Sequence, residues 1–87
     1  MQPPAPSSPT ERDAVPHLDL RGLKCPLPVL RTRKHLRTLK SGQTLSIETT
    51  DPLAGIDIPH FCREDGHRLE HAERLDNGGY RFLIRKA

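Results

Sequence analysis

The stretch HLDLRGLKCPLPVLRTRKHLRTLKSGQTLSIETT, residues 17–50, decides the fold because its hydrophobic pattern changes period twice. Leu18 and Leu20 alternate with polar neighbours, which predicts a short strand. From about Pro26 to Lys40 apolar residues return at helical spacing, and Ser41-Gly42 supplies a stop. One face of this predicted helix should pack on a sheet, and it carries Val29, Thr32, Leu36 and Leu39.

A second strand is predicted in TLSIETT, residues 44–50, where Leu45, Ile47 and Thr49 share one face. A strand–helix–strand unit of this length favours a right-handed crossover. The two strands should therefore pair in parallel.

A second helix is predicted after residue 50. Asp51-Pro52 is typical of an N-cap followed by proline at the first helical position, and Gly66 ends the segment. Pro59 removes a backbone donor that would bond near Gly55, so the helix should either be distorted there or restart with Asp57 as its cap. The apolar stripe of this helix consists of Ala54, Ile58, Phe61 and Cys62.

The last part of the chain, residues 67–86, is typical of a hairpin that turns at residues 77–79, Asn-Gly-Gly. In its second arm Tyr80, Phe82 and Ile84 alternate toward the interior. The predicted fold class is therefore α/β (α+β). It is a two-layer α/β sandwich of order βαβαββ, with a mixed four-stranded sheet and two helices on one face.

Length and composition predict one small domain behind a tail. Residues 1–16 carry five prolines among small polar residues and should form a flexible Pro-rich N-terminal tail, which leaves residues 17–87 as the domain. Only 33% of the 87 residues are hydrophobic and 3% aromatic, so no deep cofactor cavity and no cofactor are expected. No apolar run approaches the ~20 residues of a membrane span, and the N-terminus lacks a secretory signal. We expect a cytoplasmic protein without a membrane partner.

The two cysteines lie far apart in sequence, and in a reducing compartment they should be free thiols. Cys62 borders the apolar stripe of the second helix, where a small apolar residue packs well, so we expect it to be structural. CxxC and zinc-type spacings are absent, and the five histidines form no catalytic or metal signature. We therefore expect no metal site.

Cys25 precedes Pro26 and Pro28 at the predicted start of the first helix. If Pro26 is the first helical residue, Cys25 is the N-cap, and the prolines fix the first turn without losing needed donors. The positive end of the helix, the N–H of Leu27 and the nearby Lys24 and Arg21 should then stabilise a thiolate. This arrangement predicts a lowered pKa for Cys25.

The absence of a recognisable catalytic base or second cysteine beside Cys25 limits the reactions that this thiol can carry out. A cysteine hydrolase needs an imidazole base, and a disulfide oxidoreductase usually needs a second cysteine at the position that Pro28 occupies. Transfer that needs only a nucleophilic sulfur remains, such as carrying a sulfur atom as a persulfide.

Two alternative functions stay open: a redox or regulatory interaction module, and a small basic nucleic-acid-binding domain. The charge of +3 permits the latter, but few aromatics and no GXXG clamp disfavour it.

The segments GLKCPLPVLRTRK, TTDPLAGIDIPHFC and RFLIRK, with Gly66-His67, make residues 17–86 resemble the TusA/SirA/YeeD family of small sulfur-carrier proteins. The resemblance implies a βαβαββ two-layer sandwich. It also implies that Cys25 takes sulfane sulfur from a cysteine desulfurase or rhodanese-like donor and passes it to the reactive cysteine of an acceptor protein. Family members serve tRNA thiolation, molybdenum-cofactor assembly or sulfur oxidation. The N-terminal tail departs from the family pattern and puts only partner choice in doubt.

Residues around the motif receive supporting roles. Lys24, Pro26, Leu27 and Pro28 should position the active cysteine. Leu27, Leu30, Arg31 and Lys34 point away from the predicted core and should bind an acidic rim on a partner protein, although exposed leucines among solvated charges explain the same pattern. We expect a monomeric carrier that binds no nucleic acid directly.

Overall fold

The computed structural model describes residues 15–87, so the predicted tail at residues 1–16 lies outside this range except for its last two residues. The described chain has the predicted βαβαββ order. Its elements are β1 (His17–Leu20), α2 (Leu27–Leu36), β2 (Thr44–Thr49), α3 (Ala54–Asp65), β3 (Arg68–Arg74) and β4 (Tyr80–Arg85).

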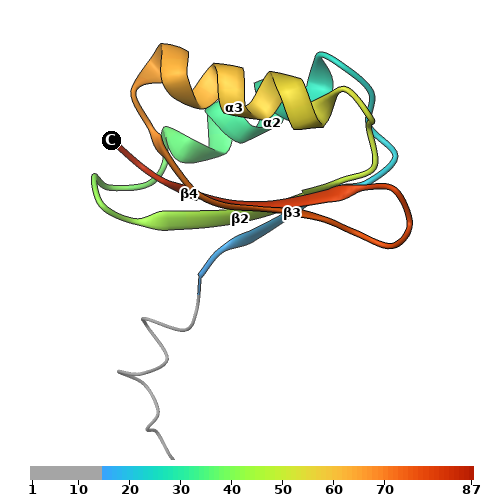
Figure 1. Ribbon diagram of the computed structural model, residues 1–87. Helices are drawn as coiled ribbons and strands as arrows, with labels where there is room; N and C mark the ends of the chain where they lie inside the picture. The colour runs from blue at the N-terminus through green and yellow to red at the C-terminus, as the bar shows by residue number, and fades with distance from the viewer. Residues whose placement is uncertain (1–14) are drawn as a thin grey trace, which may run out of the picture.

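The four strands form one mixed sheet in the order β1-β2-β4-β3. β1 pairs with β2 in parallel, with Leu18 opposite Ile47, while β4 is antiparallel to both β2 and β3. Both helices cover the same face of the sheet (Figure 1). The predicted two-layer sandwich is confirmed.

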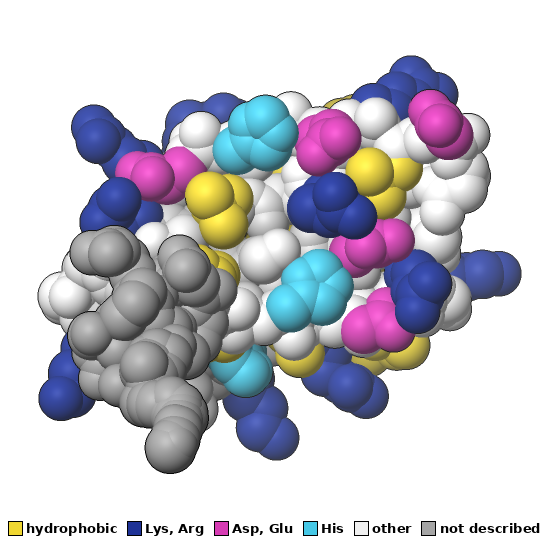
Figure 2. Space-filling view, turned by 90° about the horizontal axis from the view of Figure 1, so that it is seen from below, with side chains coloured by type: hydrophobic (Ala, Val, Ile, Leu, Met, Phe, Trp, Pro, Cys, Tyr) yellow, Lys and Arg dark blue, Asp and Glu magenta, His cyan; other side chains and the backbone are white. Residues whose placement is uncertain are grey.

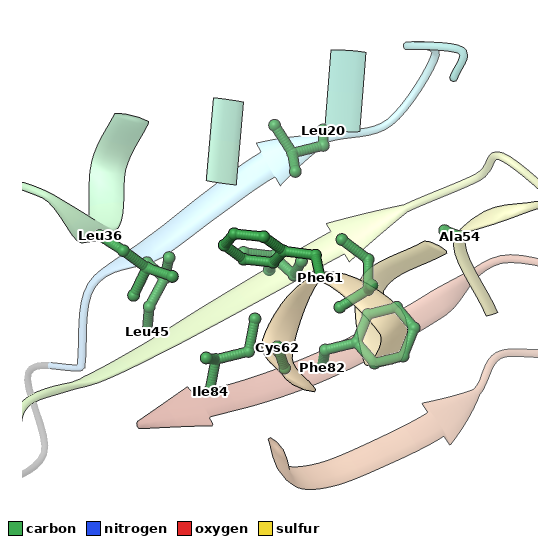
Figure 3. Close-up of a cluster of buried hydrophobic side chains, with 10 residues drawn as sticks. Leu20, Leu36, Leu45, Ala54, Phe61, Cys62, Phe82 and Ile84 are labelled. Carbon is green, nitrogen blue, oxygen red and sulfur yellow. The ribbon is translucent and has the colours of Figure 1, made fainter. Parts of the chain in front are cut away.

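The core lies between the helices and the covered face of the sheet. Its ten buried apolar side chains are Leu20, Leu36, Leu45, Ile47, Ala54, Ile58, Phe61, Cys62, Phe82 and Ile84. Figure 3 shows Phe61 of α3 between the helical layer and the strands. The predicted stripes are confirmed, although Val29, Leu39 and Tyr80 are only partly buried. Each fully buried large side chain contributes about 1.5–3 kcal/mol through removal from water.

The first helix is shorter than its periodicity predicted. It begins at Leu27 rather than Pro26 and ends at Leu36 rather than near Lys40. The ammonium of Lys86 donates to the carbonyl oxygens of Leu36 (2.9 Å) and Leu39 (3.4 Å). The carbonyl of Leu36 also accepts the N–H of Leu39 (3.0 Å) in a tighter turn, so the helix ends before Ser41-Gly42 and the predicted stop there is wrong.

The second helix runs without interruption through Pro59, so the restart at Asp57, one of the two predicted alternatives, does not occur. It begins at Ala54, two residues after the predicted start at Pro52. Gly66 ends it as predicted: its φ of 78° is a left-handed conformation that a side chain would disfavour. The N–H of the next residue, His67, then donates to the carbonyl of Cys62 (2.9 Å).

Within residues 15–87 no helix covers the other face of the sheet, and this face carries many polar and charged side chains (Figure 2). Cross-strand ion pairs connect its strands: Arg81 lies 3.4 Å from Glu48 and 3.6 Å from Glu73, and Arg85 lies 2.9 Å from Glu70. Charged side chains on this face remain hydrated, so the sheet needs no second layer. Neither helix within residues 15–87 has the length and apolarity required to cross a membrane.

Candidate functional site

The predicted reactive cysteine lies where the two helices begin. β1 and β2 are parallel, so the loops that follow them emerge at the same edge of the sheet. Cys25 lies in the loop between β1 and α2, and Asp51 lies in the loop between β2 and α3. Both helices start at this end of the molecule, on the right in Figure 1.

Asp51 joins the two loops through its side chain. It is only 7% exposed, and its carboxylate accepts hydrogen bonds from the backbone N–H groups of Cys25 (2.7 Å) and Leu53 (3.1 Å). A second tie runs from the N–H of Gly22 to the hydroxyl of Thr50 (2.9 Å). The sequence assigned Asp51 only to the start of the second helix. In the structure it also fixes the backbone of the cysteine loop.

The predicted N-cap geometry at Cys25 is wrong by one residue. Pro26 is the N-cap, with φ −97° and ψ 12°. The N–H of Leu27 donates to the carbonyl of Lys24 (2.8 Å), so it does not solvate the sulfur. The N–H of Leu27, which was expected to stabilise a thiolate, instead forms a backbone hydrogen bond within the turn of the cysteine loop.

The predicted lowering of the Cys25 pKa is also wrong. A hydrogen bond to the Asp57 carboxylate raises the pKa of this thiol, and desolvation and the negative charges of Asp57 and Asp51 act in the same direction. Arg21 does not compensate, because its guanidinium pairs with Asp19 at 2.9 Å and holds the pKa of that carboxyl at about 2. The surroundings of Cys25 therefore favour the thiol form over the thiolate.

Cys25 is exposed, and it lines two hollows. The first, about 420 Å³, is lined by residues 22–25 and 50–53, which are the two loops that Asp51 joins. The second, about 350 Å³, lies between α2 and α3, and Asp57 lines it together with Cys25. Both hollows therefore give access to Cys25.

The other predicted site residues lie around this thiol. Lys24 and Pro26 are exposed beside it, whereas Pro28 is buried in the first turn of α2. Leu27 and Leu30 are 40% and 47% exposed. Arg31 and Lys34 are also exposed on α2. Their assignment to positioning and partner binding stays a prediction.

Cys62 lies in the core, 2% exposed. Burial raises the pKa of its thiol to about 11, with the charge of Asp65 contributing. A buried thiol with so little thiolate is a poor nucleophile. Within residues 15–87, no three His, Cys, Asp or Glu side chains gather in a metal-binding arrangement.

Comparison with known proteins agrees with this geometry. A SirA-like protein from Desulfitobacterium hafniense, solved by crystallography, shares the fold with a TM-score of 0.71 and 23% sequence identity. The similarity covers 79% of this chain and 93% of that one. The family model described as sulfurtransferase TusA matches residues 17–86. Because that match spans Cys25 and every described strand and helix, the chain belongs to the TusA family of sulfurtransferases.

Proposed function

We propose that Cys25 accepts a sulfane sulfur from a donor protein, carries it as a persulfide and delivers it to a cysteine of an acceptor protein. One observation carries the proposal: of the two cysteines, only Cys25 is exposed, and it lies between two hollows at the joined starts of both helices. Family membership supports sulfur transfer in general. The delivered sulfur serves tRNA thiolation, molybdenum-cofactor assembly or sulfur oxidation, in the cytoplasm where thiols stay reduced.

The transfer step needs no cofactor and no external oxidant. The Cys25 sulfur attacks the outer sulfur of a donor persulfide, forms a new S–S bond and breaks the S–S bond of the donor. The donor leaves as a thiolate and takes up the proton that Cys25 releases. Delivery repeats the exchange, with the acceptor cysteine as the nucleophile and Cys25 as the leaving thiol. The sulfane sulfur changes its carrier, and no net oxidation occurs.

The environment of Cys25 weighs against the redox-sensor alternative. Sensor cysteines are exposed thiols with a low pKa, because the thiolate is the form that oxidants attack. Here the hydrogen bond to Asp57 raises the pKa of Cys25 instead.

Intact mass spectrometry tests the proposal. The protein is incubated with a cysteine desulfurase, pyridoxal phosphate and cysteine, or with a rhodanese and thiosulfate. We expect a reducible gain of one sulfur, about 32 Da, in the wild type and in Cys62→Ser, and none in Cys25→Ser. Sulfur loaded onto Cys62 instead, or no loading of the wild type by either donor, would contradict the assignment.

The basic side of α2 should guide the donor to Cys25. Charge reversal in the Arg31→Glu/Lys34→Glu variant should lower the rate of loading from a protein donor about tenfold at low salt, because steering between opposite charges mainly affects association. The rate is measured by quenched mass spectrometry over a range of salt concentrations. Arg68→Glu, an exposed change at the start of β3, is the control. An unchanged rate and salt slope would exclude this side of α2 from docking.

A further inference from the structure

Large apolar side chains are exposed at the starts of both helices, not only on α2. The start of α3 exposes Leu53 (50%) and Ile56 (71%), and α2 exposes Leu27 (40%) and Leu30 (47%). Among the described residues only one other large hydrophobic side chain is exposed to this degree, that of Val15, before β1. Exposed aliphatic groups that gather at one place mark an interaction site more often than scattered ones do.

Leu53 and Ile56 are linked to the cysteine through its immediate contacts. Leu53 lines the 420 Å³ hollow together with Cys25, and the Asp51 carboxylate holds the backbone N–H groups of both. Ile56 directly precedes Asp57, which lines the 350 Å³ hollow together with Cys25 and raises the pKa of its thiol. The apolar start of α3 is therefore held next to the reacting sulfur by the same side chains that shape the site.

Sulfur exchange fixes where a partner must sit. The partner's sulfur has to reach bonding distance of Cys25, so the centre of the contact lies there. A weak transient complex buries up to about 600 Å² on each partner, which corresponds to a disc of up to about 14 Å radius. Leu53 lines the same hollow as Cys25, so a contact centred on Cys25 reaches it, and Ile56 follows three positions later at the start of α3.

We propose that the start of α3, with Leu53 and Ile56 at its centre, is a second docking element that binds an apolar side chain on the cysteine-bearing loop of the sulfur-exchange partner. This inference rests on the proposed function and names the chemistry of the partner at that site. The 420 Å³ hollow beside Leu53 is the receptor for this side chain. Its wall includes Leu23, Leu53 and Pro52, and the carboxylate oxygens of Asp51 in it already accept two N–H groups.

The two docking elements differ in chemistry and therefore fix the partner's orientation. The α2 side offers Arg31 and Lys34 to an acidic rim. The α3 side offers apolar groups next to the carboxylates of Asp51 and Asp57, where a partner carboxylate would be repelled. A partner turned by half a revolution would place acidic groups against these carboxylates, so only one orientation brings the two sulfurs together.

Kinetics of loading test this second element. Leu53→Gln/Ile56→Gln and the control Val15→Gln are compared with the wild type, using a cysteine desulfurase or a rhodanese as sulfur donor. Both substituted positions are at least half exposed, so the fold should be kept, which circular dichroism checks. We expect the double variant to load at least about tenfold more slowly, as loss of a central apolar contact does in other interfaces. Val15→Gln should load at the wild-type rate.

Alkylation by iodoacetamide requires no docking of a partner protein, so it distinguishes a loss of docking from a loss of thiol reactivity. The proposal expects the same alkylation rate in all variants. Equal loading of the double variant and the wild type would overturn the second docking element and leave the carrier function standing. A loss of alkylation as large as the loss of loading would also overturn it, because the thiol itself would then be altered. A wild type that neither donor loads would overturn the carrier function and this inference with it.

Discussion

Replacing Asp51 with alanine should lower the free energy of unfolding by about 2–4 kcal/mol, because two partly buried N–H groups lose their acceptor and even a fully buried one costs only ~1–3 kcal/mol when left unpaired. The affected groups belong to Cys25 and Leu53. In a domain of this size, such a loss lowers the melting temperature by about ten degrees or more. Thermal unfolding followed by circular dichroism measures it.

The control for this variant is Asp19→Ala. Asp19 is another aspartate at the same edge of the sheet, but it is exposed and only pairs with Arg21. Exposed ion pairs contribute little to stability, so this change should shift the transition much less. Equal shifts in the two variants would show that the bonds of Asp51 to the two loops do not hold them together.

Replacing Asp57 with asparagine should make Cys25 more reactive. The carboxylate raises the pKa of the thiol through a hydrogen bond and through its charge, so its removal lowers the pKa and enlarges the thiolate fraction at neutral pH. A fall of one pKa unit gives about ten times more thiolate well below the pKa, and we expect an increase of roughly three- to tenfold in the alkylation rate at pH 7. The plot of rate against pH should keep its shape and move to lower pH.

Asp65→Asn is the matched control for this prediction. Asp65 lines the same hollow between α2 and α3, but it pairs with Arg33 at 3.3 Å and is not among the groups that shift the pKa of Cys25. Its removal should leave the alkylation profile of Cys25 in place. If Asp57→Asn gives the wild-type inflection as well, Asp57 does not bond to the thiol in solution.

The fold could be predicted because each element carries its own period in the sequence. The alternation at Leu45, Ile47 and Thr49 and the helical stripe of Ala54, Ile58 and Phe61 each point to one buried face, and these residues are buried. Helix ends were less predictable. The ammonium that takes up the last carbonyls of α2 comes from Lys86, fifty positions after Leu36, and no local pattern carries that information.

The electrostatics of the site could not be predicted from the residues next to Cys25. Local sequence shows Lys24 and Arg21, which favour a thiolate, whereas the pKa of Cys25 is raised chiefly by Asp57 in the other helix. A signal was nevertheless present. The parallel pairing that the sequence predicts places both helix starts at one edge, so Asp51 and Asp57 belong beside Cys25. The strand topology predicts that these aspartates lie near Cys25, but the individual contacts between them can be read only from the folded structure.

The burial of Cys62 sets the capacity of the proposed relay. The chain has two cysteines, and with one sulfur enclosed in the core each molecule offers a single place for cargo. The amount of sulfur in transit then cannot exceed the number of carrier molecules. A cell that needs more throughput has to raise either the abundance of this protein or the frequency of its encounters with donor and acceptor.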